Sequence, residues 1–206
     1  MQSGFSLFSR GYWREAFAHA CRPRVLWFTV LAAATGAVLS LVSFPVADSL
    51  RFSLAFPLRA LAMAAGGPVA AVFYSVAEQQ ALFYLVHPAD MAAYLCGLNT
   101  SLAACLLYGL CLYRTEITPG RLFFAKVLVN LADNVIFLSW MNALRFGGSW
   151  AAFASGALLK NLLYLPAQAL VLILTFQLAC PLLVRLSPDA AARNLRRPGR
   201  KILSLF

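Results

Sequence analysis

The stretch "ALLKNLLYLPAQALVLILTF", from Ala157 to Phe176, is an apolar run interrupted near its start by Lys160 and Asn161. A helix that crosses a bilayer needs about 20 predominantly apolar residues, so this stretch is long enough to span. A charge inside a membrane costs about 3 kcal/mol or more unless it is paired or hydrated. We therefore expect these two polar side chains to face a helix-bundle interior or a wet cavity.

The rest of the chain has the same apolar character. Of its 206 residues, 62% are hydrophobic and only 12% are charged, a balance that an ordinary soluble domain does not reach. This composition predicts one all-α integral membrane domain with six transmembrane helices. The predicted helical segments are Val25–Phe44, Phe52–Ala65, Pro68–Val86, Met91–Tyr113, Leu122–Leu144 and Ala154–Leu186.

Basic residues predict the orientation of this domain. Residues 1–24 are expected to form an amphipathic segment on the cytoplasmic face, 25–186 the six-helix membrane domain, and 187–206 a basic cytoplasmic tail. With six spans, most arginines fall on one side, so the positive-inside rule places both termini in the cytoplasm. The net charge of +10 then reflects topology and attraction to anionic lipid, and nucleic acid is not an expected partner.

Motifs for catalysis and metal binding are missing from the sequence. There is no HExxH, GxSxG or Walker motif, so we expect no enzyme activity, and any ATP hydrolysis must come from another chain. The five cysteines include no close CxxC pair, and the two histidines stand apart. Neither a disulfide, a metal site nor a cofactor is expected.

Polar residues on five predicted helices lie at a similar depth, about 10–15 Å below the outer membrane face at a rise of ~1.5 Å per residue. They are Arg59, Glu78, Gln79, Gln80, Asn99, Asn130, Asp133, Asn134, Lys160 and Asn161. One interpretation is a buried network that holds helices together, with Lys160 neutralised by Asp133 or Glu78. The other is an outward-opening solute pocket, which we favour because helix packing does not require five helices to agree in depth.

Aromatic residues near this layer suggest the chemistry of a solute. They are Phe137, Trp140, Phe146, Trp150, Phe153 and Tyr164. Rings beside amides and charges suit a flat heteroaromatic ligand with polar edges and an anionic group. Lys160, Arg59 or Arg51 could bind the anion, while the amides and carboxylates could bind the ring.

Three stretches carry a resemblance to a known family. "NLADNVIFLSW" at Asn130–Trp140, "KNLLYLPAQALVLIL" at Lys160–Leu174 and "LRFSLAFPLRALAMAAGGPVAAVF" at Leu50–Phe73 resemble the folate-specific substrate-binding S component of energy-coupling-factor (ECF) transporters. The resemblance implies the six-helix S-component fold, a multi-pass protein of the cell membrane, and folate or a related pterin as ligand. It places Lys160, Asn161 and Asn134 at that ligand.

The same resemblance implies protein partners. Such subunits work with a transmembrane T component and two cytoplasmic ABC ATPases. The family's small-residue contact with the T component corresponds to Ala33 and Ala37 in "AAATGAVLS". From the pattern alone, ordinary packing within the chain explains this pair as well. An S component for another vitamin or heterocycle, or a small membrane scaffold, remains an alternative function.

Overall fold

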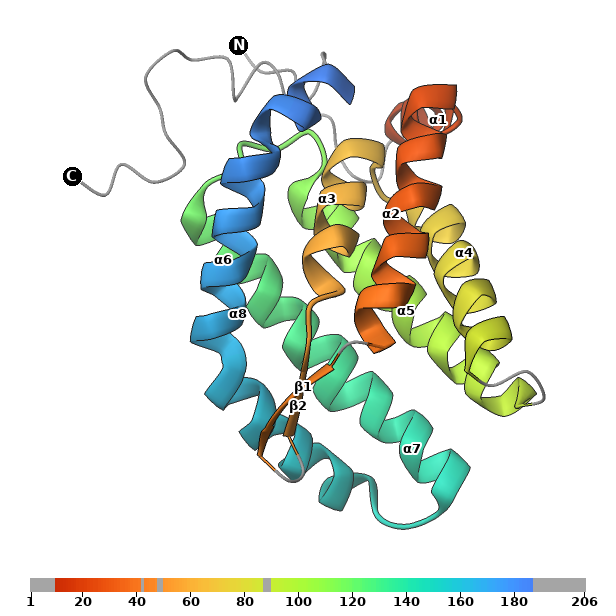
Figure 1. Cartoon of the computed structure of the whole chain (residues 1–206), viewed down its shortest axis with the longest axis vertical. Coiled ribbons are helices and arrows are strands. Elements are labelled where there is room, and N and C mark those ends of the chain that lie inside the picture. Colours follow the sequence, from red (N-terminus) through yellow and green to blue (C-terminus); the bar gives the residue numbers. More distant parts are fainter. Residues whose placement is uncertain (1–9, 42, 48–49, 87–89, 187–206) are drawn as a thin grey trace.

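Helices form most of the structure, a computed structural model that describes residues 10–41, 43–47, 50–86 and 90–186 (Figure 1). In chain order the elements are α1 (Arg10–Ala20), α2 (Pro23–Leu41), β1 (Ser43–Ala47), β2 (Leu50–Ser53), α3 (Phe56–Gly66), α4 (Ala70–Leu85), α5 (Met91–Leu112), α6 (Pro119–Val129), η1 (Asn130–Phe137), α7 (Leu138–Phe146) and α8 (Trp150–Leu186). The segments α6, η1 and α7 follow one another without a break and form one long helix of 28 residues.

Each of the six segments predicted to be helical corresponds largely to a helix. Among the described residues, four helices are long and apolar enough to cross a membrane: Pro23–Leu41, Met91–Leu112, Pro119–Phe146 and Trp150–Ala179. The chain is thus a multi-pass membrane protein. With 11 and 16 residues, α3 and α4 are shorter than a spanning helix usually is, so six crossings remain a prediction. Residues 1–9 and the basic tail at 187–206 lie outside the described residues, and the cytoplasmic termini also remain a prediction.

The connection between α2 and α3 differs from the sequence prediction. Phe44 and Phe52 were expected at the ends of helices, but they are partners in an antiparallel hairpin of β1 and β2. Pro45 lies inside β1, where it would have interrupted a helix. Short apolar runs do not distinguish a strand from a helix end, because both are simply hydrophobic. In Figure 1 the hairpin crosses in front of the lower half of the bundle.

The short helix α3 occupies the centre of the bundle. It contacts α2, α4, α5 and α8, and every residue from Ala60 to Gly66 is buried. Its sequence "ALAMAAG" consists mainly of small residues, which allow neighbouring helices to approach closely. The charged residue of this helix, Arg59, therefore lies next to the most tightly packed part of the chain.

The turn after α3 also depends on small residues. Gly67 has a φ of +80°, a left-handed conformation that glycine adopts without strain. Pro68 follows and packs against Gly109 of α5, where an added Cβ would lie 2.7 Å from the Pro68 Cα atom. The predicted break between helices at "AGGP" is confirmed. The structure also shows that Pro68 packs so closely against α5 that α5 needs a glycine at position 109.

We expect Gly109→Ala to lower the free energy of unfolding by about 1–3 kcal/mol, because the new methyl group meets backbone atoms that cannot rotate away. Gly156→Ala is the matched control, since a Cβ at Gly156 would meet no atom within 4 Å. That control should be neutral or stabilise α8 by up to about 1 kcal/mol. Unfolding in mixed detergent micelles measures both. Equal effects of the two substitutions would contradict the close contact between α5 and Pro68.

Candidate ligand-binding site

Four amide side chains meet between η1 and α8. Asn134 donates from Nδ2 to Asn130 Oδ1 at 3.2 Å and to Asn161 Oδ1 at 3.3 Å. Asn130 donates in turn to Gln168 Oε1 at 2.8 Å. These four residues form what we call the amide cluster. Three of them were predicted at one depth, and the structure brings them together.

The helical geometry explains why these amides face α8. Asn161 and Gln168 are seven residues apart, which places them on one face of α8 two turns apart. Asn130 and Asn134 lie in η1, a π-helical segment that ends where the Leu138 N–H bonds to the carbonyl of Asp133 five residues earlier. Short π-helical segments inside α-helices are frequent at functional sites. The sequence did not reveal this wider turn.

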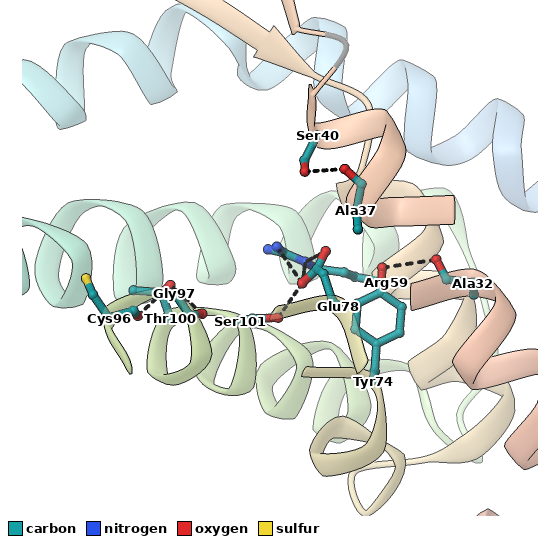
Figure 2. Close-up of polar contacts among 10 residues, drawn as sticks. All are labelled: Ala32, Ala37, Ser40, Arg59, Tyr74, Glu78, Cys96, Gly97, Thr100 and Ser101. Atoms are coloured by element: carbon teal, nitrogen blue, oxygen red, sulfur yellow. Dashed lines mark hydrogen bonds and ion pairs between the residues drawn. The ribbon is translucent and has the colours of Figure 1, made fainter. Parts of the chain in front are cut away.

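A second polar group, the ion cluster, joins α3, α4 and α5. Arg59 and Glu78 form a salt bridge of 2.9 Å, and the Glu78 side chain is fully buried. Ser101 donates its hydroxyl to Glu78 Oε2 at 2.6 Å. Figure 2 shows Arg59, Glu78 and Ser101 pointing toward one another from three helices. Glu78 therefore has its own cationic partner and is not the counter-ion of Lys160.

A buried lysine, Lys126, lies near the ion cluster and was not among the residues predicted from the sequence. Lys126 of α6 is only 3% exposed, and its Nζ lies 4.2 Å from the centre of the Phe56 ring. Asp133, two turns further along the same helix, is 5% exposed. Its Oδ1 atom has no hydrogen-bond partner among the described residues. A charged residue inside a predicted span was the signal that could have found Lys126.

Lys160 is half-buried and forms no hydrogen bond or ion pair with a described residue. It lies on the same face of α8 as the partly buried Ala157 and Tyr164, which are three and four residues away. The predicted pairing of Lys160 with Asp133 or Glu78 does not occur in the structure. Its neighbour Asn161 does have partners, because it also donates to the Ala157 carbonyl at 2.8 Å.

The remaining predicted residues lie apart from these clusters. Gln79 is buried and packs against Gly97 of α5, whereas Asn99 is exposed and donates to the Leu95 carbonyl of its own helix at 2.9 Å. The rings of Phe137 and Trp140 lie 6.1 Å apart in the second half of the long helix. Arg51 lies in β2 opposite Pro45, and its side chain is outside the described part of the structure.

A cavity of about 140 Å³ lies beside the amide cluster. Its lining residues are Val127, Asn130, Leu131, Val135, Leu158, Asn161, Leu162 and Leu165. Three of these leucines are exposed, so the cavity opens at the outer surface of the helix pair. Pockets for drug-sized ligands measure roughly 300–1,000 Å³, so this space can take one ring at most.

The predicted contact residues on α2 are not accessible. Ala33 and Ala37 are both 0% exposed, and Ala33 belongs to the apolar core with α3 and α4. Their assignment to a partner surface is corrected: the small pair packs within the chain. Ala34 is exposed on α2 instead, on the side that also carries Leu31 and Val38.

Ala33→Leu should lower the free energy of unfolding by about 1–3 kcal/mol, because a fully packed interior has no room for three more carbon atoms. Ala34→Leu adds the same atoms one residue away on the exposed side and should change stability by no more than about 0.5 kcal/mol. Thermal unfolding of both variants in one detergent compares them. A stable Ala33→Leu protein would show that α2 can move away from the bundle.

Among the described residues, no group of three or more histidine, cysteine, aspartate or glutamate side chains could hold a metal ion. The described cysteines Cys21, Cys96, Cys105 and Cys111 are free thiols. The polar groups that come together in the described part of the chain are those of the amide cluster and the ion cluster. Such groups can bind a polar solute through hydrogen bonds and charge.

The fold of this chain is similar to that of a solved structure. No family model matches the sequence, and a search of curated proteins finds no match either. A search of solved structures finds one described as FolT bound with folic acid, with a TM-score of 0.61 and 22% sequence identity. The match covers 73% of this chain and 91% of that chain. The chain therefore has a fold similar to that of FolT over nearly the whole of that protein.

Proposed function

We propose that this chain is the substrate-binding S component of an ECF transporter, and that its ligand is folate or a related pterin. The observation that carries the proposal is the likeness in fold to a protein described with folic acid bound, which extends over 91% of that protein. The stretches that resemble the folate-specific family include η1 and the part of α8 that carries the amide cluster. Fold and local sequence thus support the same function from separate directions.

The amide cluster has suitable chemistry for a pterin ring. Each amide side chain offers two N–H donors and a carbonyl acceptor. A pterin edge alternates donors and acceptors in the same way, so ring binding could replace bonds that the amides now make to one another. Lys160, which has no ionic partner among the described residues, could bind the ligand's anionic group. Because the cavity beside the cluster holds one ring at most, the rest of the ligand requires space that opens on binding.

The proposal includes partners and orientation. Transport would need a T component and two ABC ATPases, with the chain in the cell membrane, six spans, and both termini in the cytoplasm. Since Ala33 and Ala37 are buried, the T-component contact on α2 would use exposed residues instead. The exposed side of α2 comprises Trp27, Val30, Leu31, Ala34, Thr35, Val38 and Leu41.

A panel of vitamins tests the proposal. The purified protein should bind folic acid or a reduced folate saturably in calorimetry, and should not bind riboflavin, thiamine or biotin. Asn161→Ala should weaken this binding, whereas Ser155→Ala, on the exposed side of α8, should not. Saturable binding of a different vitamin would make the chain another kind of S component. No binding of any vitamin would favour the membrane-scaffold alternative.

A further inference from the structure

The helix α1 is held against one end of the bundle by a single face. Its buried residues are Tyr12, Ala16, His19 and Ala20, a spacing that forms one stripe along a helix. His19 Nε2 lies 3.0 Å from the carbonyl oxygen of Ala65 at the end of α3. Glu15 forms an ion pair of 2.6 Å with Arg114, which follows α5. Figure 1 views α1 nearly end-on, so this helix lies across the axis of α2 rather than along it.

The other side of α1 is basic and aromatic. Arg10 and Arg14 are exposed, and so is Phe17, with 58% of its surface accessible. The start of α2 continues this character with Arg24 and with Trp27, which is 74% exposed. Glu15, the acidic residue of α1, is already paired with Arg114. The exposed side of α1 and the exposed residues at the start of α2 therefore carry positive charge and aromatic rings, and we call them together the basic-aromatic face.

The chain itself places this face beside a membrane. α1 ends at Ala20 and α2, a membrane-span candidate, begins at Pro23, so only Cys21 and Arg22 separate them. Two residues reach about 7 Å at most, so α1 cannot leave the surface of the bilayer that α2 enters. Helices that lie in the interface carry arginine or lysine together with tryptophan, phenylalanine or leucine. The crosswise direction of α1 is the direction that such a helix takes.

We propose that the basic-aromatic face binds anionic phospholipids of the adjacent leaflet, with arginines on the phosphates and aromatic rings at the level of the headgroups. Arg10, Arg14 and Arg24 supply the charge, and Phe17 and Trp27 supply the apolar contact. The contacts of His19 and Glu15 with the bundle fix α1, so the bound lipids also fix the orientation of this end of the protein. This inference does not depend on which solute the chain binds.

Native mass spectrometry of the full chain tests the inference. The purified protein is titrated with phosphatidylglycerol or with phosphatidylcholine in detergent, and the bound lipid molecules are counted. The parent should prefer phosphatidylglycerol. Each arginine near an anionic surface strengthens binding roughly fivefold. Arg10→Gln/Arg14→Gln should therefore reduce the preference by about 25-fold. Both substituted side chains are exposed, so folding should be unaffected.

Arg121→Gln/Arg185→Gln is the matched control. It removes the same charge from exposed positions at the start of α6 and near the end of α8, and it should keep the preference for phosphatidylglycerol. Equal binding of the two lipids by the parent would overturn the inference. So would an equal loss in the two double variants, because the preference would then come from net charge rather than from α1. A change of oligomeric state in Arg10→Gln/Arg14→Gln with unchanged lipid binding would assign the face to a second copy of the chain.

Discussion

Glu78→Ala should lower the free energy of unfolding by about 3–5 kcal/mol, the usual cost of leaving one charge of a buried ion pair without its partner. The carboxylate of Glu78 is fully buried and accepts hydrogen bonds from both Arg59 and Ser101. Without it, the Arg59 guanidinium next to the tightly packed centre of α3 loses its ion-pair partner. Unfolding in mixed detergent micelles, with circular dichroism as the signal, measures the loss.

Two comparisons make this expectation specific. Arg145→Ala removes one partner of the exposed ion pair between Arg145 and Asp90, and should cost no more than about 1 kcal/mol. The double variant Arg59→Met/Glu78→Leu should be more stable than Glu78→Ala alone, because it removes both charges of the pair and leaves neither without a partner. If Glu78→Ala unfolds like the parent but no longer binds ligand, the ion cluster belongs to the binding site and does not support the fold.

Lys160→Ala should weaken folate binding by about one to two orders of magnitude while leaving the stability of the free protein nearly unchanged. A charge-assisted hydrogen bond contributes roughly 1.5–3 kcal/mol, and about 1.4 kcal/mol corresponds to a tenfold change in affinity. Stability should change little because Lys160 has no ionic partner among the described residues. Calorimetric titration and a melting curve on the same preparation give the two quantities.

The neighbouring amides provide a contrast. Asn134→Ala should weaken ligand binding by a similar or smaller factor, but it should also destabilise the protein, because Asn130 and Asn161 each lose a hydrogen-bond partner. Arg145→Ala controls for the loss of a positive charge elsewhere. A Lys160→Ala protein that melts much earlier than the parent, yet binds folate as tightly at low temperature, would rule out a ligand contact at Lys160.

The sequence alone determined the medium and the helical character of this protein. Continuous apolar runs such as Ala157–Phe176 lack the alternation of a β-barrel strand, so in lipid they form helices, whose backbone polar groups bond within their own segment. The break at "AGGP" was predictable for a similarly local reason, because glycine and proline act on their own backbone. Depth along a helix is also local, at about 1.5 Å per residue, so the common level of Asn130, Asn134 and Asn161 could be predicted.

Only the tertiary structure decided which side chains meet. The depth of a residue in the membrane does not specify toward which neighbouring helix its side chain points. The sequence therefore could not show that Glu78 pairs with Arg59 rather than with Lys160. It could not assign Ala33 and Ala37 to the interior, because small residues favour close packing against any neighbouring helix, within the chain or outside it. The hydrogen bonds from Asn130 to Gln168 and from Asn134 to Asn161 join η1 to α8, and they form only because the fold packs these two segments together.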